Sequence, residues 1–405
     1  MIHALLVDLD DTLLENDLSR FIPAYFDLLA EELSAFAPKE RVLTAILAGT
    51  KAMVGNEDPR RTLAEIFYQV FQSATGADPA AVADSLGHFY AQIYPRLASL
   101  THPKEGAAAL LRAASARGLE IAVATNPLMI RPAIEQRLSW AGVPTPLFPY
   151  ALISDVETFH FAKPRPAFFA EALAYLGRLP SEAVMVGNDQ TEDLDPAAAL
   201  GLPVFHVTSA PDGEASAGGP AEAVRWLESR LEEERPSVTR PEALIARFEG
   251  QLAAVLTKMS RLEDGELRLA SDDGGLAPLQ IVCHLRDVDR EVNLPRLETI
   301  LQQDDPFFSP VDTDSWIEAR AYLAEQPAAA LQGFVAARQD VTATLRLLAP
   351  EQWQRRVRHS LLGPMSLADW MAVLAEHDLR HMAQIPTHLE RRPPPAFSLE
   401  PGRMK

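Results

Sequence analysis

The chain has 405 residues, of which 47% are hydrophobic and 7% aromatic, and its formal net charge at pH 7 is −19. This length and composition are typical of a globular protein with two or three domains. The charge and the lack of a basic stripe argue against a nucleic-acid partner, and no apolar run approaches the roughly 18 residues of a membrane span.

Short apolar strands alternate with helical patterns along the first half of the chain. The expected strands are residues 3–7, 120–125, 150–154, 183–187 and 203–207. This order predicts an α/β fold, in which a doubly wound parallel sheet carries helices on both faces.

A long insertion, at about residues 15–103, follows the first strand. It shows no strand signals, and its apolar residues recur at helical spacing, as in the segment 63–71. We interpret it as a helical cap over the end of the sheet. The proline-containing stretch 235–241 breaks the pattern, so the first domain is expected to comprise residues 1–235.

Strand signals vanish in the second half, and four long helical patterns remain, near 241–263, 278–303, 326–348 and 366–390. They predict an all-α four-helix bundle over residues 240–392, followed by a tail at 393–405. Pro295 falls inside the second pattern and should kink or interrupt that helix.

The stretch VDLDDTL, residues 7–13, places Asp8 and Asp10 at the end of the first strand. Ligands of open parallel sheets bind at the carboxyl ends of the strands. Carboxylates this close repel each other, and a nearby cation would offset that repulsion. Bound Mg²⁺ would let one remain ionised as a nucleophile while its neighbour works as acid and base. The alternative is a turn and helix cap, where Asp and Thr are common.

Two further stretches supply groups suited to a phosphate. Thr125 and Asn126 end the second strand, and Pro127 then opens a helix, so a hydroxyl and free backbone N–H groups face the same edge. Lys163, in FAKPRPAFF, offers a point charge for a phosphoryl oxygen. The alternative for Lys163 is an ordinary solvated lysine.

A second acidic cluster follows the strand at 183–187. Four of its residues carry side-chain oxygens suited to a hard cation, and a glycine precedes them. The residues are Gly187, Asn188, Asp189, Asp193 and Asp195.

With these four motifs in this order, residues 1–235 resemble the haloacid dehalogenase-like (HAD) hydrolase superfamily. The motifs are DxDxT at Asp8, Asp10 and Thr12, the strand-ending Thr125, Lys163 in a KPRP setting, and the acidic motif at 187–193.

The resemblance implies that Asp8 attacks phosphorus to form an aspartyl phosphate. Asp10 would protonate the leaving oxygen and later activate water, with its backbone carbonyl joining Mg²⁺ coordination. Thr125 and Asn126 would hold the phosphoryl group, and Lys163 would offset the charge between nucleophile and phosphate.

The acidic motif departs from the commoner form, because Asn188 rather than an aspartate follows Gly187. We expect Asp189 to bind Mg²⁺ and Asp193, one turn later, to support it, which together with Asp8 and Asp10 completes the expected metal set. The other register would make Asn188 a neutral ligand.

Dehalogenases of the superfamily need no metal, so the intact acidic cluster favours a phosphatase. A phosphotransferase would use the same groups.

Three histidines of the second half fall on inward-facing helical stripes. His377 and His381 stand at i and i+4, so their rings can converge on one metal, and His284 lies on the inward stripe of an earlier helix. Three neutral imidazoles would leave positions open for water or substrate. The alternative is a set of core histidines hydrogen-bonded to their neighbours.

Residues 241–390 also resemble the DinB/YfiT-like bundle superfamily. The resemblance rests on one histidine early in the second helix, the HxxxH pair in the fourth, and the surrounding HDLRHMAQI and GPMSLADW. It implies a divalent transition metal, Zn²⁺ or Ni²⁺ among the candidates, with relatives that include thiol-dependent transferases.

The sequence thus predicts a Mg²⁺-dependent phosphatase for a small phosphorylated metabolite, fused to a metal-binding bundle. In the alternative, the bundle carries the main activity as a metal-dependent hydrolase or thiol transferase, or it senses a ligand. The HAD domain is then a regulatory or scaffold module.

Cys283 is the only cysteine, which excludes an internal disulfide and agrees with a cytoplasmic location. We expect no membrane partner, and the bundle could support a homo-oligomer.

Overall fold

The computed structural model describes residues 1–209, 215–233, 236–270 and 274–388. The chain divides into two compact units, one of Met1–Ala172 with Pro180–Pro236, the other of Leu173–Leu179 with the residues from Ser237 onward. The tail expected at 393–405 lies outside the described residues. Among the helices of the described ranges, none has the length and apolar character needed to cross a membrane.

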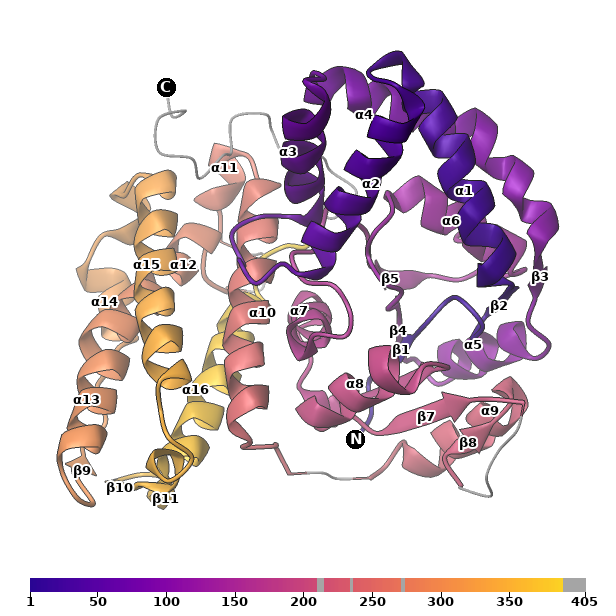
Figure 1. Ribbon diagram of the computed structural model, residues 1–405. Coiled ribbons are helices and arrows are strands. Elements are labelled where there is room, and N and C mark those ends of the chain that lie inside the picture. Colours follow the sequence, from indigo (N-terminus) through magenta and orange to yellow (C-terminus); the bar gives the residue numbers. More distant parts are fainter. Residues whose placement is uncertain (210–214, 234–235, 271–273, 389–405) are drawn as a thin grey trace. The chain divides into compact units, whose positions relative to one another are not determined.

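A parallel sheet of six strands forms the centre of the first unit (Figure 1). In spatial order the strands are β5 (Tyr150–Ile153), β4 (Glu120–Val123), β1 (Ala4–Val7), β6 (Ala183–Gly187), β7 (Val204–Val207) and β8 (Ala217–Gly218). Strands β1 and β6 are buried at every position, because helices cover both faces and leave no polar side to alternate with. The predicted doubly wound α/β fold is confirmed.

Helices pack on both faces of this sheet. On one face, α5 (Ala107–Ala116), α6 (Arg131–Trp140) and α9 (Pro220–Arg230) share a hydrophobic core with the strands, through side chains such as Leu111 and Leu138. In Figure 1, α7 (Pro166–Leu176) and α8 (Asp195–Leu200) lie on the other side of β1.

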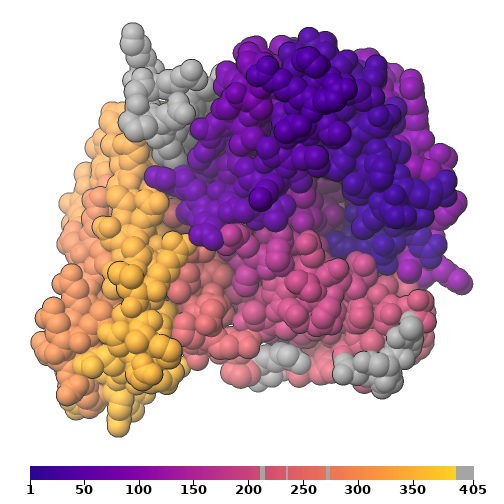
Figure 2. Space-filling model, in the orientation of Figure 1, coloured from indigo at the N-terminus to yellow at the C-terminus, as the bar shows by residue number. Residues whose placement is uncertain are grey.

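The insertion after the first strand is helical, as its periodicity predicts. Its helices are α1 (Leu18–Glu32), α2 (Lys39–Val54), α3 (Leu63–Thr75) and α4 (Pro79–His88), followed by short helical turns at Phe89–Ile93 and Tyr94–Leu100. Helix α3 begins with a capping box, in which Thr62 and Glu65 satisfy each other's backbone N–H groups. The indigo residues of these helices gather over one end of the unit (Figure 2).

Two short strands border the insertion, contrary to the expectation that it contains none. β2 (Leu14–Asn16) and β3 (Thr101–Pro103) pair antiparallel, with Glu15 opposite His102. A three-residue strand is too short to show the period-two alternation on which strand prediction depends.

The second unit contains the four predicted long helical segments. These are α10 (Pro241–Ser260), α12 (Pro278–Val288) with its continuation α13 (Leu294–Gln302), α15 (Pro327–Arg346) and α16 (Leu367–Met382), and the shorter α11 (Asp264–Leu267) and α14 (Ser315–Ala319) lie between them. A π-helical segment, Asp289–Asn293, separates α12 from α13 immediately before Pro295. The interruption predicted at Pro295 is therefore confirmed, and its effect falls beyond His284.

The prediction that strands vanish in the second half is wrong. A small sheet contains β9 (Phe307–Phe308), β10 (Arg356–His359) and β11 (Gly363–Ser366), in the order β11-β10-β9. The hairpin of β10 and β11 leads into α16, whose first turn is closed by a capping box of Ser366 and Asp369. These strands of two to four residues give too weak a pattern to be read from the sequence.

Candidate active site and metal centre

The sheet brings the four predicted site segments of the first unit to one edge. Asp8 directly follows β1, Thr125 follows β4, Lys163 lies between β5 and α7, and Gly187 ends β6. Because β1 pairs in parallel with both β4 and β6, their carboxyl ends meet at this edge.

Lys163 connects two carboxylates in the interior. Its Nζ lies 2.8 Å from Oδ1 of Asp8 and 2.5 Å from Oδ1 of Asp193, and all three side chains are buried. Lys163 is therefore not an ordinary solvated lysine. Burial works to lower its pKa, but the two carboxylates outweigh burial and raise it. Burial and the charge of Asp8 raise the pKa of Asp193 to about 6, against the opposing effect of Lys163.

Two carboxylates facing one ammonium leave an excess of negative charge at this edge. A divalent cation with oxygen ligands would offset that excess, so the residues present fit the predicted Mg²⁺.

The acidic motif turns two of its side chains toward the other motifs. Oδ1 of Asn188 accepts a hydrogen bond from Oγ1 of Thr12 at 3.2 Å, and Asp193 contacts Lys163. The exposed Asp189 instead accepts hydrogen bonds at 2.8 Å from two backbone N–H groups of the following helical segment, as a helix cap does. Coordination of Mg²⁺ by Asp189 stays a prediction. Of the residues in this motif, Asn188 and Asp193 are the ones whose side chains contact the other predicted motifs.

Gly187 allows Asp193 to fold back over the strand end. A Cβ at position 187 would collide with the Asp193 carboxylate, whose Oδ2 accepts hydrogen bonds at 3.1 Å from the backbone N–H groups of Asn188 and Asp189. Glycine is therefore required here for close approach rather than for a special backbone angle.

Asp10 has two partners that the sequence did not indicate. Nδ2 of Asn16 donates to Oδ1 of Asp10 at 3.1 Å, and the guanidinium of Arg137 forms an ion pair with the same oxygen. Arg137 is buried on α6 over the ring of Phe21, and burial lowers its pKa to about 10 although Asp8 opposes the shift. In the sequence Arg137 resembles any arginine of an amphipathic helix, so nothing there marked it.

The predicted phosphate-binding pair lies beside these groups in the sheet order. The helix expected to begin at Pro127 begins instead at Arg131, as α6, because residues 126–130 form an irregular loop. Thr125 is buried, and its backbone carbonyl accepts a hydrogen bond from Oγ of Ser154 at 2.7 Å. Nδ2 of Asn126 donates to Oε2 of Glu192 at 3.1 Å, while its Oδ1 has no hydrogen-bond partner among the described residues. The side-chain atom of Asn126 that has no partner is thus an acceptor, and a phosphoryl oxygen would have to take the Nδ2 donor from Glu192.

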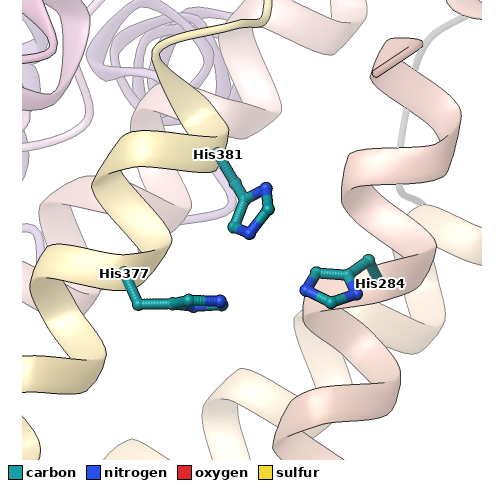
Figure 3. A group of neighbouring side chains, drawn as sticks. All are labelled: His284, His377 and His381. Atoms are coloured by element: carbon teal, nitrogen blue, oxygen red, sulfur yellow. The ribbon is translucent and has the colours of Figure 1, made fainter. Parts of the chain in front are cut away.

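The second unit brings the three predicted histidines together. His284 projects from α12, and His377 and His381 project from α16 toward it (Figure 3). One ring nitrogen of each lies within 4.8 Å of the others, and the ring centroids of His377 and His381 are 4.6 Å apart.

The nitrogens of this triad have the character of metal ligands. Within the described part of the chain, both ring nitrogens of His284 and Nδ1 of His381 are buried without a hydrogen-bond partner. The alternative of core histidines satisfied by their neighbours therefore does not describe His284. Burial, reinforced by His377, lowers the pKa of His381 to about 4 and lowers that of His284. The neutral, unpaired nitrogens of His284 and His381 fit a divalent transition metal. His377 differs, because burial works to lower its pKa but Asp378 opposes burial and raises it.

Two family models match separate parts of the chain. A family model described as haloacid dehalogenase-like hydrolase matches residues 2–201, and a DinB superfamily model matches residues 247–385. A relative named phosphoglycolate phosphatase, from Rhodospirillum rubrum, is 31% identical over 209 residues, which are 50% of this chain and 78% of the relative.

Two solved structures also resemble parts of the chain. YfiT from Bacillus subtilis, described as a probable metal-dependent hydrolase with an unusual four-helix bundle topology, is 24% identical. The matched region covers 38% of this chain and 87% of the YfiT chain, with a TM-score of 0.34. A HAD phosphatase from Thermococcus onnurineus is 18% identical and covers 58% of this chain and all of its own, with a TM-score of 0.34.

Proposed function

Because the chain belongs to the haloacid dehalogenase-like hydrolases and, in its second half, to the DinB superfamily, we propose that its first unit is a Mg²⁺-dependent phosphatase. It hydrolyses a small phosphate monoester through an aspartyl phosphate. The observation that carries this proposal is the buried group of Asp8, Lys163 and Asp193 at the sheet edge. The phosphoglycolate phosphatase relative makes 2-phosphoglycolate the first ester to test.

The chain's own residues divide the reaction between them. A carboxylate oxygen of Asp8 attacks phosphorus. The bond from phosphorus to the leaving oxygen breaks as Asp10, which starts protonated on the oxygen that Arg137 and Asn16 do not contact, gives the leaving oxygen that proton. Asp10 then takes a proton from water, whose oxygen attacks the aspartyl phosphate, releases inorganic phosphate and restores Asp8. Throughout, the ammonium of Lys163 offsets negative charge near Asp8.

Two pairs of residues position these groups. Thr125 and Asn126 hold the phosphoryl oxygens, and Asn16 and Arg137 hold the Asp10 carboxylate in place. Bound Mg²⁺ would supply positive charge between nucleophile and phosphate. The side chains of Asp8 and Asp193, the carbonyl of Asp10, and either Asn188 or Asp189 would hold it.

Phosphate release from a panel of small esters, with and without Mg²⁺, tests this proposal. Asp8→Asn keeps the shape of the nucleophile but removes its charge, so we expect kcat/KM to fall by about a thousandfold or more. Asp11→Asn is the matched control, because Asp11 is the adjacent carboxylate and only caps the backbone N–H of Asn16. Turnover that survives Asp8→Asn, or that needs no divalent cation, would refute the mechanism.

We further propose that His284, His377 and His381 bind one divalent transition metal, Zn²⁺ or Ni²⁺. The unpaired buried nitrogens of His284 and His381 favour this second function. Three protein ligands would leave positions open for hydrolysis or group transfer. Metal titration of the full chain should show one site that His284→Ala removes. A reaction lost in His377→Ala but kept in Asp8→Asn would assign an activity to the bundle.

A further inference from the structure

A chain of polar side chains extends from the triad into the interior of the second unit. Nδ1 of His377 lies 3.1 Å from Oδ1 of Asp378, and Nη2 of Arg338 donates to Oδ2 of Asp378 at 2.5 Å. Nε of Arg338 donates to Oδ2 of Asp289 at 2.7 Å, and Nδ2 of Asn293 donates to Oδ1 of Asp289 at 2.8 Å. The chain thus joins α16, α15 and the π-helical segment after α12.

The centre of this chain of polar side chains is fully buried. Arg338 is 0% exposed, and its guanidinium lies 5.0 Å from the ring centroid of Phe248 and 5.2 Å from that of Phe334. Asp289 and Asp378 are each 1% exposed. Since neither carboxylate can turn to water, Asp378 is held where it meets His377.

The contact with Asp378 decides which nitrogen of His377 is free. Nη2 of Arg338 donates to the other oxygen of Asp378, which favours the ionised carboxylate. An ionised carboxylate can only accept a hydrogen bond, so in the neutral ring of His377 Nδ1 carries the proton and Nε2 keeps its lone pair. Figure 3 shows the His377 ring pointing toward the other two histidines, the direction in which a ligand nitrogen must face.

This chain of polar side chains carries a formal charge of −1 when His377 is neutral. Both oxygens of Asp378 and both of Asp289 face N–H groups, which matches ionised carboxylates, and Arg338 offsets only one of the two charges. Burial raises the pKa of Asp289, and the guanidinium opposes that effect. Uncompensated charge is unfavourable in an interior, and a divalent cation at the neighbouring triad would offset it.

We propose that Asp378, held in place by Arg338 and Asp289, is a positioning residue of the metal centre, fixing His377 in the tautomer that presents Nε2 to the metal. This inference rests on the proposed metal site of the triad. Carboxylates that accept from the remote nitrogen of a ligand histidine typically affect metal affinity by about 10- to 100-fold.

Two asparagine variants separate orientation from charge. Asp378→Asn and Asp289→Asn each remove one negative charge and leave Arg338 one carboxylate, but only Asp378→Asn changes the partner of His377. In competition with a chromophoric chelator, we expect Asp378→Asn to weaken Zn²⁺ binding by about 10- to 100-fold and Asp289→Asn by much less. Equal losses in the two variants would overturn the positioning assignment.

The tautomer itself is a second readout that requires neither a variant nor bound metal. Nitrogen-15 NMR of the metal-free wild-type chain should show His377 protonated on Nδ1, and Asp378→Asn should abolish that preference. A wild-type His377 protonated on Nε2 would refute the inference even if Asp378→Asn failed to fold. Wild-type protein that binds no Zn²⁺ would instead refute the metal site, and the inference with it, whatever the tautomer.

Discussion

Asp8 and Asp193 share the single buried ammonium of Lys163. In the metal-free chain, burial and Asp8 raise the pKa of Asp193 to about 6, whereas the unfolded value is close to the ordinary 3.8. An acid whose pKa is higher in the folded state binds its proton more tightly there. The folded state is therefore penalised progressively as pH rises from about 4 to about 6. The arrangement thus costs stability above about pH 4 and places a carboxylate where the proposed Mg²⁺ would bind.

This sign gives a pH prediction. In EDTA, the free energy of unfolding of the wild-type chain should fall between pH 4 and pH 7 relative to that of Asp193→Asn, which lacks the titrating group. Denaturant titrations at several pH values measure the difference, and saturating Mg²⁺ should reduce it because the cation favours ionised Asp193. Parallel pH profiles for the two proteins would contradict the prediction.

Gly187 gives a steric prediction at the same scale. Because an added Cβ would displace the Asp193 carboxylate, we expect Gly187→Ala to lower kcat/KM by about 100-fold and to destabilise the fold by about 1–3 kcal/mol. Gly87→Ala, on α4, is the control, since a Cβ there meets nothing within 4 Å. That variant should keep full activity, and equal losses in the two variants would show that close approach at Gly187 is unimportant.

Candidate site residues were predictable where a strand end, a loop before a helix or a helical spacing singled them out. Asp8, Lys163 and the three histidines were named from such patterns, and the structure brings each set together. Arg137 was not predictable, because its pairing with Asp10 depends on how α6 packs against the sheet. Asp378 stands next to His377 in the sequence, yet the helical pattern does not reveal that its carboxylate turns toward both His377 and Arg338.

At the scale of elements, α15 contributes the cation that holds its neighbours together. Arg338 bridges Asp289 of the π-helical segment and Asp378 of α16. The long helices and the break before Pro295 followed from periodicity and proline chemistry. The location of the bridge did not, because a buried Arg–Asp pair and an exposed one have the same sequence signature.

Removing this bridge should weaken the second unit. Arg338→Met leaves two carboxylates buried without a cation, so we expect a loss of about 3–5 kcal/mol in the free energy of unfolding. The control is Arg346→Met on the same helix. Its side chain is 49% exposed and pairs with Glu249, so that change should cost about 1 kcal/mol or less. Calorimetry of the full chain compares the two, and similar losses would mean that Arg338 does not act as an interior bridge.

At the scale of the whole molecule, each unit assembles its candidate site from its own residues. The HAD motifs lie between Asp8 and Asp193, and the triad lies between His284 and His381. Fusion in one chain does not by itself couple two sites, because coupling requires that each ligand change the affinity for the other.

Metal removal and replacement should therefore act on the units separately. After treatment with EDTA, Mg²⁺ should stabilise the first unit and Zn²⁺ the second, each by about 2.7 kcal/mol at a concentration 100 times its Kd. His377→Ala should abolish the Zn²⁺ effect and leave Mg²⁺-dependent phosphate release unchanged. A change in phosphatase kcat/KM on Zn²⁺ titration of the wild type, absent in His377→Ala, would instead show that the bundle regulates the phosphatase.

The antiparallel pair of β2 and β3 has a consequence for movement. The chain enters the helical insertion through Leu14–Asn16 and leaves it through Thr101–Pro103, so any movement of α1–α4 against the sheet would turn about this ribbon. Asn16 stands at the far end of β2 and donates to Asp10. A movement that drew Asn16 away would break its contact with Asp10 and leave the ion pair with Arg137 of α6 as the remaining partner. In the proposed phosphatase, opening the insertion would therefore also loosen the proposed acid.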